Sequence, residues 1–252
     1  MTPQPKSISQ RIQFFAIFPF LVLSFFLLQE GAAWAQKVAS LNQVKGNVRV
    51  FEPGSSRGKK GRDGMALFVN SKIQTVSADA MADIVYVKGG IVRIMPNSEV
   101  TLDDTDLEGD VTKAKLDLSE GKIFNVVSRL VEGSTYEVKT RTATAGVKGT
   151  VFSAETNGAQ DTFMVKEGKV QVGAGNQQVL VADLKKSVVP ANQTPGQPVD
   201  LTPEEIAMFD ILDDLLESIK TDIREEVQES IKEDIIQNAI EKDMEMDMDG
   251  MH

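Results

Sequence analysis

Through the middle of the chain, apolar and polar residues alternate in short runs with the two-residue period of a half-buried β-strand. Tyr136, Val138 and Thr140, for example, alternate with charged residues. Such runs recur between residues 36 and 189, with glycine, asparagine and aspartate at their ends, as is typical of turns. The pattern predicts an all-β domain over residues 36–189, a twisted β-solenoid-like or sandwich-like stack of short strands.

A different period begins after the proline-rich residues 190–201, which we interpret as a linker. Thr202-Pro203-Glu204-Glu205 combines a threonine cap, a proline at the first helical position and a glutamate three residues after the cap. Apolar residues then recur every three or four positions on an acidic background, which predicts a long amphipathic α-helix over residues 202–242. The repeat exceeds 3.5 residues, so the stripe should drift around a partner rather than form a regular coiled coil. We expect a disordered Met/Asp tail over residues 243–252.

The amino-terminal residues predict export. Lys6 and Arg11 precede an apolar run, and the small residues of the Ala-Trp-Ala sequence at 33–35 suit cleavage by a signal peptidase. We interpret residues 1–35 as a signal peptide cleaved before Gln36, which predicts a periplasmic or otherwise extracytoplasmic protein. The alternative is an uncleaved membrane anchor, because the apolar run approaches the minimum length of a membrane span. The chain has no cysteine, so its stability must come from a packed core.

Charge is divided unevenly between the predicted parts. Residues 200–252 hold 18 acidic and 4 basic residues, a net charge of −14, whereas residues 36–199 carry a net charge of +3. The acidity therefore belongs to the C-terminal segment alone, which indicates two parts with different solvation.

A strand, a break at two glycines and a second strand form the most informative motif, over residues 138–152. Its landmarks are Gly146, Lys148, Gly149, Thr150 and Phe152. The two glycines are expected to supply backbone freedom where the chain turns tightly or passes close to a neighbour. This motif resembles the core motif of the FecR-domain family, in which an arginine usually stands at the position of Lys148. A bidentate contact made by that arginine would not be reproduced by lysine.

Further segments resemble parts of the same family, and they occur in the family's order. They are residues 44–50, 69–75, 82–102, 116–124 and 165–172. The resemblance implies an extracytoplasmic all-β sensing or interaction domain. FecR itself crosses the inner membrane and acts on a sigma factor through a cytoplasmic segment. Only 11 residues precede the apolar run here, so we do not expect direct regulation of a sigma factor.

We therefore interpret the chain as an exported, non-enzymatic binding or scaffolding module of the cell envelope. The alternative is a periplasmic signalling partner of a membrane-bound regulator, and an envelope-acting enzyme comes third. No catalytic residues, metal site or cofactor are predicted, because the single histidine is His252, at the very end of the chain, and no cysteine nucleophile exists. The methionines and histidine of the tail could instead bind copper(I), whereas the simpler interpretation is a solvated tail.

Two segments are candidate contact sites. The first is a flexible basic loop that could contact an anion on a lipid headgroup, an envelope polysaccharide or an acidic protein; its residues are Arg57, Lys59, Lys60 and Arg62. Nucleic acid is not expected, because no aromatic residues interleave with these cations. The second is the apolar stripe of the helix, which could drive self-association or bind a protein partner; its residues are Leu212, Leu216, Ile219, Ile223 and Val227. The stripe could otherwise fold back onto the β domain. Contact with a membrane is expected only if the signal is not cleaved.

Overall fold

The computed structural model describes residues 37–86, 90–106, 111, 113–128 and 130–217, and the structural statements below concern these residues. The chain divides into two units, Met1–Ala35 and Gln36–His252. The first unit lies outside the described residues, so the signal peptide stays a prediction. None of the described helices is long and apolar enough to span a membrane.

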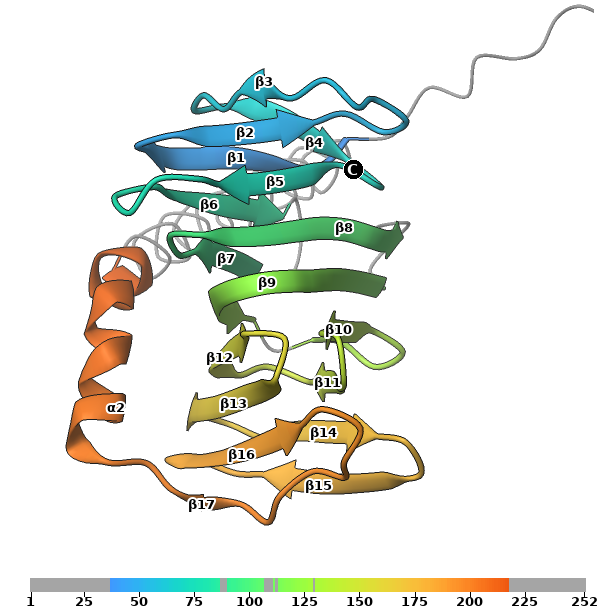
Figure 1. Cartoon of the computed structure of the whole chain (residues 1–252), viewed down its shortest axis with the longest axis vertical. Helices are drawn as coiled ribbons and strands as arrows, with labels where there is room; N and C mark the ends of the chain where they lie inside the picture. Colours follow the sequence, from blue (N-terminus) through green and yellow to red (C-terminus); the bar gives the residue numbers. More distant parts are fainter. Residues whose placement is uncertain (1–36, 87–89, 107–110, 112, 129, 218–252) are drawn as a thin grey trace, which may run out of the picture. The chain divides into compact units, whose positions relative to one another are not determined.

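The described part of the second unit is mostly β-strand, which confirms the predicted all-β domain (Figure 1). Its strands form one continuous hydrogen-bonded network with two branches, which we call sheet A and sheet B. The order of strands in sheet A is β4 (Met65–Phe68), β1 (Lys37–Lys45), β6 (Met81–Tyr86), β7 (Gly90–Ile94), β9 (Lys113–Val127), β12 (Val151–Thr156), β13 (Gln160–Glu167), β16 (Lys185–Pro190) and β17 (Val199–Asp200). The order in sheet B is β3 (Lys59–Lys60), β2 (Val48–Phe51), β5 (Lys72–Thr75), β8 (Ser98–Asp106), β9, β10 (Thr135–Lys139), β11 (Thr144–Val147), β14 (Val170–Ala174) and β15 (Gln177–Val181).

Strand β9 belongs to both sheets and changes from one to the other at Gly121. Its first half pairs with β8 and β10 in sheet B, and its second half pairs with β7 and β12 in sheet A. Gly121 has a φ of +88°, and a Cβ on it would lie 2.6 Å from the backbone oxygen of Asn97. Only glycine fits this position without strain, because the left-handed backbone and the close neighbour both exclude a side chain.

The main core lies between the two sheets, where the inward-facing residues of both pack together. Tyr86 on β6 and Tyr136 on β10 meet edge-to-face, with ring centroids 6.3 Å apart. Val138, Phe152 and Phe163 are fully buried. The two-residue alternation found in the sequence therefore corresponds to an inward face and an outward face on each strand.

The segment predicted as a linker is fastened along sheet A. β16 ends at Pro190, and the Ser187 hydroxyl donates a 2.7 Å hydrogen bond to the carbonyl of Gly196. Three residues after Gly196, β17 begins and pairs with Lys185 and Lys186, so the chain leaves the sheet only beyond Asp200.

The C-terminal helix begins where the sequence predicted. Thr202 caps α2 (Pro203–Ala207) with a complete capping box that involves Glu205. The chain then tightens into the 3₁₀ helix η2 (Met208–Leu212), and residues 213–217 are again α-helical. A long, regular α-helix is therefore not supported: the helix contains a 3₁₀ segment, and residues 218–242 and the tail lie outside the described residues.

Candidate functional site

The motif of residues 146–152 is the crossover from sheet B to sheet A. β11 ends at Val147, Lys148 is exposed, and Gly149 turns the chain with a φ of +98°. The backbone of Thr150 then exchanges hydrogen bonds of 3.0 and 3.1 Å with Val127. Phe152, on β12, is fully buried in the main core.

The expectation of a turn holds for Gly149 and is wrong for Gly146. Gly146 lies inside β11, opposite Glu137 on β10 and Gln171 on β14, and its φ is not positive. A Cβ on Gly146 would have no heavy atom within 4 Å. The missing side chain at this position therefore opens space on the outer face of sheet B.

This open space belongs to a groove on the outer face of β10, β11, β14 and β15. Two adjoining hollows of about 570 and 430 Å³ share Glu137, Gly146 and Gln171. On the neighbouring strand, a Cβ on Gly173 would meet the side chain of Gln178 at 3.3 Å and the carbonyl oxygen of Gln177 at 3.9 Å. Glycines on two neighbouring strands therefore make a floor in which backbone is accessible, and we call this feature the sheet B groove.

The rim of the sheet B groove is mostly basic. Its charged residues are Glu137, Lys139, Arg141, Lys148 and Lys169. Lys139 pairs with Asp117 at 3.5 Å, whereas no salt bridge to the other three cations occurs within the described residues. The groove thus offers positive charge and hydrogen-bonding groups to a polar or anionic ligand.

Asp161 holds the end of the sheet B groove in place, and sequence reasoning missed it. It is fully buried on β13, where one carboxylate oxygen accepts hydrogen bonds from the Thr140 hydroxyl at 2.5 Å and from the backbone and hydroxyl of Thr142. These bonds tie the turn between β10 and β11 to sheet A. The signal was present in the sequence, because Asp161 occupies the same alternation as the core residues Phe163 and Val165.

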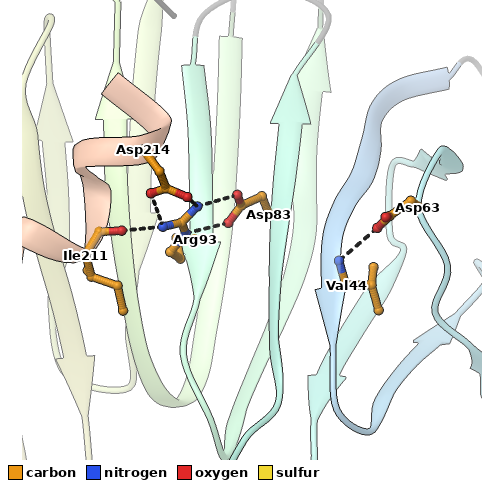
Figure 2. Close-up of polar contacts among 6 residues, drawn as sticks. All are labelled: Val44, Asp63, Asp83, Arg93, Ile211 and Asp214. Carbon is orange, nitrogen blue, oxygen red and sulfur yellow. Dashed lines mark hydrogen bonds and ion pairs between the residues drawn. The ribbon is translucent and has the colours of Figure 1, made fainter. Parts of the chain in front are cut away.

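The basic segment Arg57–Arg62, which the sequence predicted to be a flexible loop, contains a short strand. Lys59 and Lys60 form β3, with Lys60 opposite Arg49, and Lys59 pairs with Glu52 at 2.5 Å. Just beyond Arg62, the carboxylate of Asp63 accepts a 2.8 Å hydrogen bond from the backbone of Val44 (Figure 2). Arg57 and Arg62 remain exposed, so the segment presents a basic strip at one end of sheet B.

The described part of the helix stripe packs within the chain. Leu212 is fully buried in a second apolar cluster, together with Phe209, Leu215, and Phe124 and Met164 of sheet A, and Leu216 packs against this cluster. Ile219, Ile223 and Val227 lie outside the described residues. The fold-back alternative therefore holds for residues 206–216, and self-association through the remaining stripe stays a prediction.

A buried charge cluster fastens the tip of the helix, as Figure 2 shows. The Arg93 guanidinium donates to both oxygens of Asp83, at 2.9 and 2.8 Å, to Asp214 at 2.9 Å and to the carbonyl of Ile211. Burial raises the pKa of Asp83 although Arg93 opposes it, whereas the hydrogen bond from Arg93 lowers the pKa of Asp214. Asp83 and Arg93 occupy outward positions on their strands, and nothing in the sequence indicated what would cover them.

Among the residues that the structure describes, no group of three or more acidic or histidine side chains is placed to hold a metal ion. The Met/Asp/His tail, with His252, lies outside these residues, so copper binding there is not tested.

Comparison with known proteins identifies part of the chain. Residues 72–171 match the model of the family described as FecR protein, which confirms the resemblance over a range that includes the 146–152 crossover. Two solved structures of a candidate anti-sigma factor from Parabacteroides distasonis ATCC 8503 are also similar, with 18% and 19% sequence identity and TM-scores of 0.46 and 0.45. The alignments cover 55% and 54% of this chain and 63% and 62% of those chains, so the chain spans less than two thirds of their length. No curated protein matches the sequence.

Proposed function

Because residues 72–171 match the FecR family, we propose that the chain is a non-enzymatic protein-binding module with a regulatory role in the cell envelope. The sequence alone favoured scaffolding over signalling. The family match favours the signalling alternative, in which the module is the extracytoplasmic partner of a membrane-bound regulator. Export through residues 1–35 is part of this proposal.

The observation that carries the proposal is the sheet B groove. It lies on the crossover motif, which falls within the residues that match the family, and its floor contains Gly146 and Gly173. The backbone of the floor is already hydrogen-bonded within the sheet, but the glutamines and cations that flank it suit an extended polypeptide that lies in the groove and hydrogen-bonds to their side chains. Gln171 and Gln178, which hydrogen-bond each other at 2.9 Å, are available for such contacts.

A crosslinking experiment in the native host tests this proposal. A photoreactive amino acid at Gln171, which is exposed in the groove, should give a discrete protein adduct in the envelope. The same amino acid at Thr101, which lies on the outer face of the same sheet at β8, should give none. Equal adducts from both positions would contradict a specific groove.

A blocking substitution tests whether the groove matters for regulation. Gly146→Trp should fill the groove with little loss of stability, because its backbone is unstrained and its Cβ meets open space. In a deletion strain, this variant should fail to restore the wild-type transcript profile, whereas Thr101→Trp should restore it. Full restoration by Gly146→Trp would refute a regulatory role for the groove.

A further inference from the structure

The helical residues 203–217 lie across sheet A along one row of side chains. The register of the strands places each member of the row opposite the next, and their alternation with core residues puts them on the outer face. From β6 to β16 the row consists of Asp83, Arg93, Phe124, Ser153, Met164 and Lys186. We call these six residues the sheet A row and residues 203–217 the strap.

The strap matches the sheet A row along its length. At its start, Glu205 pairs with Lys186; in the middle, Phe209 meets Phe124 edge-to-face with ring centroids 5.3 Å apart. At its tip, Asp214 pairs with Arg93 at 2.9 Å. The four strand spacings from Lys186 to Arg93 span about 19 Å, whereas nine α-helical residues rise only about 13.5 Å. The 3₁₀ segment, which rises about 2 Å per residue, lengthens the strap toward this span.

The sheet can lose the strap without leaving a buried charge alone. Two of the hydrogen bonds of Arg93 go to Asp83 on the neighbouring strand, so this ion pair is complete within the sheet. Removal of one partner from a buried pair is costly, but departure of the strap removes neither. The Ser153 hydroxyl, in contrast, is buried on the outward face and has no hydrogen-bond partner within the described residues. The strap therefore covers the row without satisfying all of its polar groups.

The two ends of the strap are held unequally. Its root continues from β17, and the backbone of Leu201 donates a 2.8 Å hydrogen bond to the carbonyl of Leu184. The tip is held by hydrogen bonds from Arg93 to Ile211 and Asp214 and by the packing of Leu212 and Leu215. Helices this short are marginal without such tertiary contacts, so a partner helix that takes over these contacts can displace the tip while the root stays attached.

We propose that the sheet A row is a docking site for an amphipathic helix of another protein, and that the strap occupies this site in cis until the partner helix displaces it. The matching partner carries apolar residues at three-residue spacing, as Ile206, Phe209 and Leu212 do here. It also carries a carboxylate five residues after its central aromatic residue, where it reaches Arg93 as Asp214 does. Such helices bind through apolar anchors, and the charges at both ends set their direction.

A peptide of residues 202–217 is the probe for this site, added in trans to the full-length protein. The cis strap competes at high effective concentration, so the wild type should bind the labelled peptide weakly. The double variant Phe209→Ser with Leu212→Ser weakens only the strap and should bind at least about tenfold more tightly, because its site is more often free. A control peptide with the same two serines should bind neither protein.

Hydrogen exchange shows whether the strap opens by itself. In the wild type, amides of residues 206–217 should exchange at least about tenfold faster than those of β12 and β13, which lie beneath them. Equal rates would mean that the strap opens only with the whole domain and would overturn the proposal. Failure of the double variant to bind more peptide, although its strap amides exchange rapidly, would also overturn it.

Two further controls keep the outcomes distinct. If circular dichroism shows that the double variant loses β structure, Asp214→Lys takes its place, because the Asp214 side chain is exposed and contacts the sheet through its ion pair with Arg93. The strap of Asp214→Lys should also be displaced more easily by the peptide. If the wild type forms a dimer and the double variant does not, the strap of one copy occupies the sheet A row of another copy. That result would overturn the proposal that the partner helix belongs to another protein. Gly146→Trp should leave peptide binding unchanged, so the proposal for the sheet B groove can fail without changing the result of this peptide experiment.

Discussion

The Arg93 cluster allows a quantitative test, because its partners differ in burial. The side chains of Arg93 and Asp83 are 2% and 1% exposed, whereas that of Asp214 is 57% exposed. Arg93→Met would leave the Asp83 carboxylate buried without its two hydrogen bonds from the guanidinium. Loss of one partner of a buried pair costs about 3–5 kcal/mol. This is a large part of the roughly 5–15 kcal/mol that stabilises a typical domain.

Two companion variants separate charge burial from the tip contact. Asp214→Asn should cost less than about 1 kcal/mol, because Arg93 keeps Asp83 and the lost ion pair faces solvent. The double variant Asp83→Leu with Arg93→Met removes both charges and should recover most of the loss caused by Arg93→Met alone.

Urea unfolding followed by far-ultraviolet circular dichroism at pH 7 measures all three effects, with the slope of the transition checked for two-state behaviour. The expected order of stability is Asp214→Asn, then the double variant, then Arg93→Met. An Arg93→Met protein within about 1 kcal/mol of the wild type, or one no less stable than Asp214→Asn, would refute the argument that Asp83 depends on Arg93.

Three further predictions follow from the core, the glycines and the tip of the strap. Phe152→Ala should lower the free energy of unfolding by about 3–5 kcal/mol in urea titrations, because its side chain is fully buried between the sheets; a loss below about 1 kcal/mol would contradict this placement. Gly121→Ala should reduce stability by more than about 1 kcal/mol, because of the positive φ at this position and the clash of a Cβ with neighbouring backbone. Gly146→Ala should instead be neutral or stabilising. Equal melting temperatures of the two variants would contradict this difference. The pKa of Asp214 is lower in the folded state than its usual value of 3.8. The ionised side chain therefore stabilises the fold fully above pH 3.8, and this stabilisation is lost as the pH falls through the folded-state pKa. Stability should therefore fall below about pH 4, and Asp214→Asn should show a smaller fall if the reasoning is correct.

The sequence alone determined the local structure of this protein. Alternation marked the strands, the turn residues marked their ends, and the capping box at Thr202 marked the start of the helix, because each depends on residues close together in the chain. The motif of residues 146–152 indicated the resemblance to the FecR family for the same reason, and residues 72–171 match the model of that family. Alternation alone did not show which strands share a sheet, nor that β9 changes sheets at Gly121, since pairing depends on partners distant in the chain.

Only the tertiary structure decided what the outward faces do. The sequence treats Gly146 as a break, but the fold makes it the floor of a groove because its neighbours on two other strands leave its side-chain space open. Likewise, Asp83 and Arg93 fit the polar positions of ordinary half-buried strands, and their burial arises only when a helix more than 100 residues later crosses them. Contacts between distant segments depend on the register of the strands and on the path of the chain after Pro190, which no local pattern encodes.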